Sequence, residues 1–147
     1  MLGRIGHLSR RFFGSLSDAP PPASDEAWAE GFLLAGECRL WRSMSNADRR
    51  HSIVVARRFV ADGDAPSRDE TAGCLLHDVG KTESGLGTWA RVAATVVGAR
   101  GRRFSTYHDH ERLGAELCRA AGSSEGTILL VSGRGSSRDR LRRADTV

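Results

Sequence analysis

The sequence has little that would cross a membrane or build a disulfide framework. Its longest apolar-rich stretch, near residues 92–97, is far shorter than the roughly 18 apolar residues that a membrane span requires. Residues 1–22 lack the uninterrupted apolar centre of a secretory signal, so we expect a cytoplasmic protein. Cys38, Cys74 and Cys118 are far apart and form no CxxC pair, which argues against a thiolate zinc site. We expect all three cysteines to be small core residues.

Aromatic residues and lysine are also scarce. Aromatic side chains make up 6% of the chain, and Lys81 is the only lysine among 22 basic residues. The arginines are scattered in pairs, whereas a nucleic-acid surface would cluster its charge, with stacking aromatics in single-strand binders. We therefore do not expect nucleic acid as the main partner, and the net charge of +4 indicates at most an attraction for anionic substrates.

Most of the sequence shows apolar residues at helical spacing. Its length of 147 residues suits a single hydrophobic core. Residues 2–16 space their apolar side chains as an amphipathic helix does, and the prolines that follow end it. Docking of this helix on its own domain is the expectation, and contact with a membrane surface is the alternative. We therefore divide the chain into an N-terminal helix and proline-rich linker, residues 1–23, and a helical domain, residues 24–147.

Capping signals place the remaining helices. Ser45 with Asp48, and Ser67 with Glu70, have the three-residue spacing of a capping box. Residues 127–131 are the only strand-like run, so the prediction is an all-α, single-domain helical bundle with an extra N-terminal helix. The helices of the domain are expected at residues 24–44, 45–61, 67–78, 88–97, 106–121, 125–132 and 139–147.

Six polar residues fit poorly with plain helix faces. The apolar run in "CLLHDVGK" ends in His77 and Asp78, and burying either side chain without a partner costs several kcal/mol. Imidazole and carboxylate together suit a divalent transition metal. Adjacent residues on a helix point about 100° apart, but at a helix end just before Gly80 both can turn toward one ion. The six residues are His51, His77, Asp78, His108, His110 and Asp145.

The order His…His-Asp…Asp resembles the HD-domain superfamily of metal-dependent phosphohydrolases. The resemblance covers residues 45–147 through four segments in order: "NADRRHSIVVARRF", "AGCLLHDVGK", "YHDHERLGAELCRAAG" and "RRADTV". It implies a bundle of about five helices around one divalent metal (Mn, Fe, Co, Ni or Zn). The four ligands that it implies are His51, His77, Asp78 and Asp145.

The same resemblance implies roles for residues near these ligands. His110 matches a histidine that supports a second metal or the substrate phosphate in many members, and His108 is a candidate to share that role. Because no histidine lies between residues 79 and 107, one metal is expected rather than two. Lys81 would hold the substrate phosphate, and Asp78 would be a general base as well as a ligand. The catalytic set is therefore Asp78, Lys81 and His110.

The expected function is hydrolysis of a phosphate ester of a nucleotide or similar small molecule by a metal-activated water. The alternative is a non-catalytic HD module that binds a nucleotide or metal and acts as a regulatory or interaction domain. Each residue also has a plainer interpretation. His51 would be a hydrogen-bonded surface histidine, His77 and Asp78 a helix cap, and Asp145 part of a frayed end. Lys81 would be a loop charge, and His108 and His110 part of a solvated face.

Overall fold

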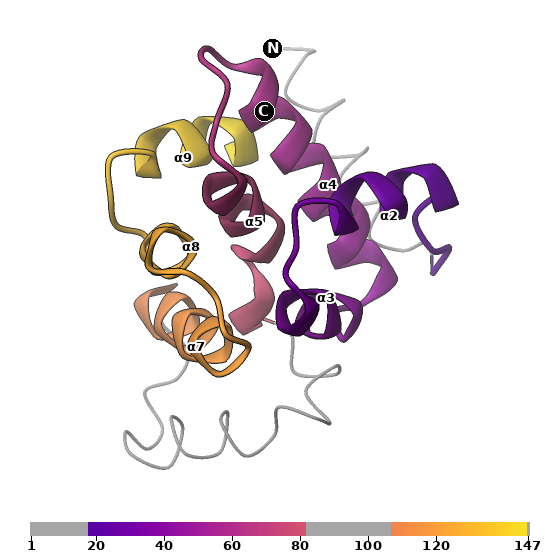
Figure 1. The fold of residues 1–147 in the computed structure, drawn as a ribbon, viewed down its shortest axis with the longest axis horizontal. Helices are drawn as coiled ribbons and strands as arrows, with labels where there is room; N and C mark the ends of the chain where they lie inside the picture. The colour runs from indigo at the N-terminus through magenta and orange to yellow at the C-terminus, as the bar shows by residue number, and fades with distance from the viewer. Residues whose placement is uncertain (1–17, 82–106, 147) are drawn as a thin grey trace, which may run out of the picture.

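The structure, a computed structural model, describes residues 18–81 and 107–146. Every regular element in these two ranges is helical, which confirms the all-α class (Figure 1). The expected helices at residues 2–16 and 88–97 lie outside the described residues. The elements are α2 (Ala23–Glu30), α3 (Ala35–Arg42), α4 (Asn46–Ala61), α5 (Arg68–Leu76), the 3₁₀ turn η1 (Val79–Lys81), α7 (Tyr107–Ala120), α8 (Glu125–Val131) and α9 (Arg138–Thr146).

Local capping chemistry starts the two helices that lead to the site. Ser45 Oγ accepts a hydrogen bond from Asp48 N at 3.1 Å at the start of α4. At the start of α5, Ser67 Oγ accepts from Glu70 N, and Glu70 Oε2 accepts from Ser67 N at 2.8 Å. Both N-caps were predicted and are confirmed, and the reciprocal bond of a capping box is seen at Ser67. The strand-like run at residues 127–131 lies in α8, also as predicted.

The prediction of one continuous helix over residues 24–44 is wrong, because the chain breaks between α2 and α3. Leu34 N donates to Glu37 Oε2 at 2.8 Å and so starts a new helix at Ala35. Arg68, on α5, donates to the same carboxylate oxygen at 3.1 Å and to Phe32 O at 2.8 Å. The local cap therefore starts the new helix, and a residue more than thirty positions away reinforces the break.

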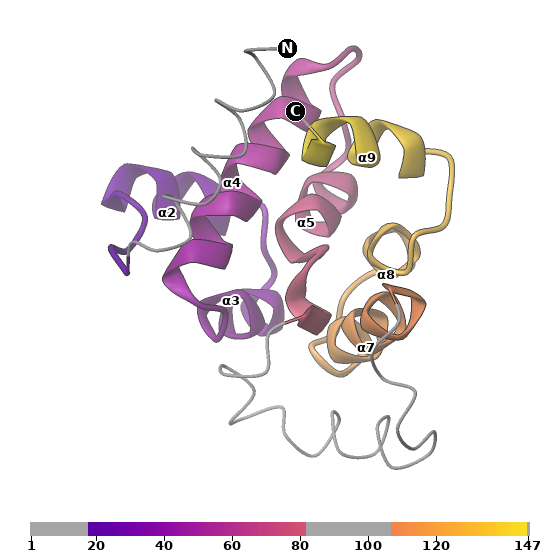
Figure 2. The same ribbon diagram turned by 180° about the vertical axis from the view of Figure 1, so that it is seen from behind.

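Helix α5 lies at the centre of the described part of the fold, beside α4, α8, α9 and α3 in both views (Figures 1 and 2). The core around it includes Trp41, Phe59, Leu75 and Leu117, each fully buried. Cys74 and Cys118 are also in the core, as expected, while Cys38 is half-buried. None of the helices in the described ranges is long and apolar enough to span a membrane.

The segment after α5 is fixed by a close backbone crossing with α7. A Cβ atom at Gly80 would lie 2.0 Å from His110 O and 2.8 Å from Gly114 N, so only glycine allows η1 to approach α7 this closely. His110 Nδ1 lies 3.3 Å from Gly80 O in the same crossing. Because Gly80 lies only two residues after Asp78, the crossing helps to hold His77 and Asp78 in place.

Candidate metal centre

Four side chains from three separate parts of the chain converge at one point of the bundle. His51 lies in the first half of α4, His77 and Asp78 follow the end of α5, and Asp145 lies near the end of α9. One potential ligand atom from each lies within 4.8 Å of all the others. These are the four residues that the resemblance implies as ligands.

The separations between these atoms are those of groups that surround one small cation. His51 Nε2 lies 2.8 Å from Asp145 Oδ1 and 4.0 Å from Asp78 Oδ2. His77 Nε2 lies 3.3 Å from Asp78 Oδ2 and 3.6 Å from Asp145 Oδ1. Two ligands each about 2.1 Å from an ion lie about 3 Å apart when adjacent and about 4 Å apart when opposite. The geometry therefore fits a single divalent ion with modest adjustment.

The imidazole of His77 gives the most direct sign that a ligand belongs here. Its Nδ1 donates to Cys74 O at 2.7 Å, which fixes the ring and turns Nε2 toward the two aspartates. The side chain is only 7% exposed, and Nε2 is a buried atom without a well-formed hydrogen bond. In many metal sites a histidine donates the N–H of one ring nitrogen to a backbone carbonyl and binds the metal through the other ring nitrogen. The ring of His77 has this orientation.

The electrostatics of the cluster are those of two carboxylates that need a positive charge. Burial lowers the pKa of His77, but Asp145 and Asp78 outweigh this effect and raise the pKa to about 10. Burial raises the pKa of Asp78, but His77 and Lys81 outweigh it and hold that pKa below its usual value. The hydrogen bond with His51 and the close approach of His77 likewise hold the pKa of Asp145 below its usual value. A protonated imidazole therefore supplies the charge that a cation would supply.

The donor set fits a divalent transition metal. Two imidazole nitrogens with two carboxylate oxygens suit Mn, Fe, Co, Ni or Zn better than the oxygen-only cages that Mg²⁺ and Ca²⁺ prefer. Each of the four residues is at least partly buried, so the ligand atoms are held by the packing of α4, α5 and α9.

The three remaining residues predicted from the sequence, Lys81, His110 and His108, are not among the four that converge. Lys81 Nζ lies 2.7 Å from Asp78 Oδ1, so Lys81 pairs with one of the candidate ligands. His110 is half-buried against Gly80 O and is not one of the four converging residues. His108 lies in the first turn of α7, and its side chain is outside the described part of the structure.

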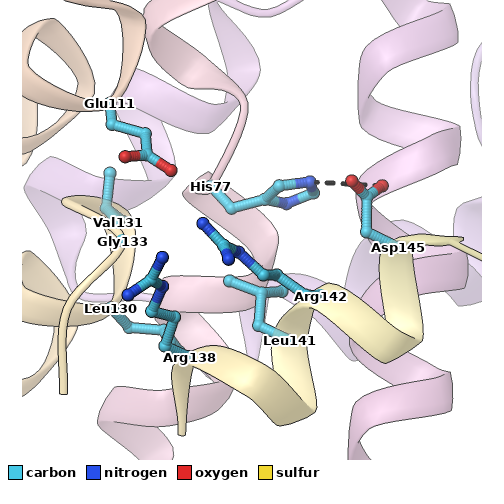
Figure 3. Close-up of a pocket in the computed structure, with 9 residues that line it drawn as sticks. All are labelled: His77, Glu111, Leu130, Val131, Gly133, Arg138, Leu141, Arg142 and Asp145. Carbon is cyan, nitrogen blue, oxygen red and sulfur yellow. Dashed lines mark ion pairs between the residues drawn. The ribbon is translucent and has the colours of Figure 1, made fainter. Parts of the chain in front are cut away.

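A recess adjoins the cluster and has residues that the sequence analysis missed (Figure 3). His77 and Asp145 form part of its wall, and Arg138, Arg142 and Glu111 project into it. The spacing of residues 138, 142 and 145 puts them on one face of a helix, which is the sequence signal that could have identified the two arginines. The other lining residues are Leu130, Val131, Gly133 and Leu141.

Comparisons of the chain with protein-family models, curated proteins and solved structures found no match. The residues of the cluster, their geometry and their charges therefore carry the information on function.

Proposed function

We propose that the protein is a metal-dependent phosphohydrolase that acts on a phosphate ester of a nucleotide or similar small molecule. The observation that supports this proposal most is the convergence of two histidines and two aspartates, with a buried imidazole nitrogen directed into the cluster. The order of these residues along the chain, which resembles the HD-domain superfamily, supports the same activity.

In this proposal His51, His77, Asp78 and Asp145 hold one divalent transition metal. When bound, such an ion activates water for attack and polarises a phosphoryl oxygen. Lys81 keeps Asp78 Oδ1 occupied, so that Oδ2 faces His77 and His51. The low pKa of Asp78 makes it a weak base, so its first role is to bind the ion, and proton transfer is its second.

His110 and His108 are proposed to act on the substrate side, where positive charge stabilises the phosphoryl group in the transition state. His110 contacts Gly80 O, and Gly80 lies two residues after Asp78. This contact places His110 close to the backbone that carries a candidate ligand. A change at His110 should therefore reduce turnover while metal content stays close to that of the wild type. Loss of metal together with activity would make His110 part of the metal site instead.

A phosphatase assay with defined metals tests the proposal. The purified protein is loaded with manganese, cobalt or nickel and assayed with p-nitrophenyl phosphate and a panel of nucleotides. We expect hydrolysis that depends on the metal and that Asp145→Asn reduces by more than about 100-fold, because an amide is a far poorer ligand than a carboxylate. Asp139→Asn is the matched control, since Asp139 is an exposed aspartate on the same helix.

The same assay separates the proposal from its alternative. A protein that binds the metal through Asp145 and hydrolyses none of these substrates would be a non-catalytic module that binds metal or nucleotide. A wild type that binds none of the metals would overturn the phosphohydrolase proposal and the metal-binding form of the alternative, and would leave the cluster as a buried ion-pair network.

A further inference from the structure

The arginines of α9 fall into two groups with different environments. Arg140 donates to Phe59 O at 2.6 and 3.1 Å and to Asp64 O at 2.9 Å, and Arg143 pairs with Asp62 at 3.3 Å. These two side chains fasten α9 to the end of α4. Arg138 and Arg142 make no ion pair with any carboxylate in the described ranges, although both are exposed on the same short helix. Arg138 and Arg142 are therefore not needed to anchor the helix.

Arg138 and Arg142 instead project into the recess beside the metal cluster (Figure 3). They come from the helix that also provides Asp145, and His77 lies between their guanidinium groups and Asp145 in the close-up. The floor is apolar and comes from Leu130, Val131 and Leu141. An anion in the recess would thus contact two guanidinium groups and lie next to the cluster.

The charge of the recess favours an anion. Its two guanidinium groups lie beside the carboxylate of Glu111, while the other carboxylate of the lining, that of Asp145, is paired with His51 at 2.8 Å and lies 3.6 Å from His77. Guanidinium groups bind phosphate through paired N–H donors, which gives both affinity and a fixed orientation. The position of Glu111 is itself constrained, because its carboxylate packs against Gly133, where a Cβ atom would lie 2.5 Å from Oε2.

We propose that Arg138 and Arg142 form an anion subsite that binds a second phosphate group of the substrate while the first is hydrolysed at the metal cluster. This inference rests on the proposed function and deepens it. The substrate class becomes small molecules with two separate phosphate ester groups, such as nucleoside bisphosphates, in preference to simple monoesters.

Kinetics on two substrates test the subsite with the metal-loaded protein. For a nucleoside bisphosphate, Arg142→Gln and Arg138→Gln should each raise KM about tenfold and leave kcat nearly unchanged, as loss of one charge-assisted contact would. For p-nitrophenyl phosphate, which has no second phosphate, KM should stay at the wild-type value. The KM of Arg142→Lys should lie between those of the wild type and Arg142→Gln, because lysine keeps the charge and loses the paired N–H donors. Arg143→Gln is the matched control from the opposite face of α9.

A binding measurement separates failure of the subsite from failure of the proposed function. Inorganic phosphate is titrated by calorimetry into protein from which metal has been removed, so that the arginines are the cations tested. Binding that Arg142→Gln weakens at least fivefold and Arg143→Gln leaves intact supports the subsite even if no ester is hydrolysed. Equal phosphate binding by the two variants, no phosphate binding by the wild type, or an equal rise in KM for both substrates would overturn it.

Discussion

His77 shows at the scale of one residue why the cluster is unusual. A buried imidazole in an apolar setting would lose its proton, because burial penalises the charged form. Here two neighbouring carboxylates reverse that outcome and raise the pKa of His77 to about 10. The side chains are therefore arranged for a positive charge at the point where Nε2 meets Asp78 and Asp145.

Asp78→Asn tests whether that positive charge is a metal ion. The substitution keeps the size of the side chain and removes the charge that balances the cation. We expect metal affinity to fall by more than about 100-fold and hydrolysis to be lost with it. Calorimetric metal titration together with the manganese-supplemented phosphatase assay measures both effects.

The matched control for this substitution is Asp62→Asn, at an exposed aspartate that pairs with Arg143. It should leave metal affinity and turnover at the wild-type level, because exposed ion pairs contribute little. If Asp78→Asn binds metal and turns over normally, Asp78 only ends its helix, and the phosphohydrolase proposal loses its central residue.

At the scale of elements, the crossing of η1 and α7 holds the His77–Asp78 segment. Helix α5 ends at Leu76, and the chain then passes against α7 at a distance that leaves no room for a side chain at Gly80. Because Gly114 lies at the same crossing, both backbones are glycine-lined where they meet. The direction of the two ligands thus depends on backbone contact rather than on their own helix.

Gly80→Ala is expected to disturb the crossing and the cluster together. Its new Cβ would overlap the backbone of His110, so α7 or η1 must shift, with a loss of stability of about 1–3 kcal/mol. Metal affinity should fall at least tenfold in the fraction that remains folded. Chemical denaturation and metal titration measure the two losses.

Gly31→Ala serves as the comparison, because Gly31 is exposed with φ of −61° and an added Cβ would lie 3.3 Å from the nearest atom. It should change stability by less than about 1 kcal/mol and leave metal affinity unchanged. A Gly80→Ala protein with normal stability and normal metal affinity would show that the crossing does not position the ligands.

At the scale of the whole molecule, the cluster joins parts of the chain that pack on different sides of α5. Asp145 lies 94 positions after His51, and α9 reaches α4 only at the end of the described chain. An ion bound by all four side chains would stabilise the folded state by mass action, since the unfolded chain cannot assemble them. Removal of the metal should therefore lower the melting temperature.

The stability of the metal-free protein should also fall as pH rises from 6.5 to 8.5. His77 has a pKa of 6.5 when unfolded and about 10 when folded, so its contribution is fully present below pH 6.5 and is lost as pH rises toward 10. The slope should approach about 1.4 kcal/mol per pH unit within this window. Denaturant unfolding at several pH values measures it.

The upper limit of this pH window, 8.5, lies below the pH at which ionisation of the buried cysteine thiols affects stability. Burial raises the pKa of Cys118 to about 12 from 9.0, so thiols add their own loss of stability only at higher pH. With metal bound, the downward slope should disappear, because the ion replaces the proton on His77. A metal-free protein whose stability does not fall across this window would mean that His77 is not held in its protonated form.

The sequence alone predicted the features that depend on neighbours within one helix. The caps at Ser45 and Ser67 join residues three positions apart, and the apolar periodicity that defines the helices has a similarly short range. The four residues of the cluster could also be named, because their order resembles a family in which they act together. That they bind metal stays a prediction.

Tertiary structure decided what depends on distant partners. The break between α2 and α3 is held in part by the pairing of Arg68 with Glu37, and packing brings Lys81 beside Asp78, while its expected contact with phosphate stays a prediction. The division of the α9 arginines into anchors and recess residues depends on which side of the helix meets α4. Helical periodicity shows which residues share a face, but only packing determines what that face meets.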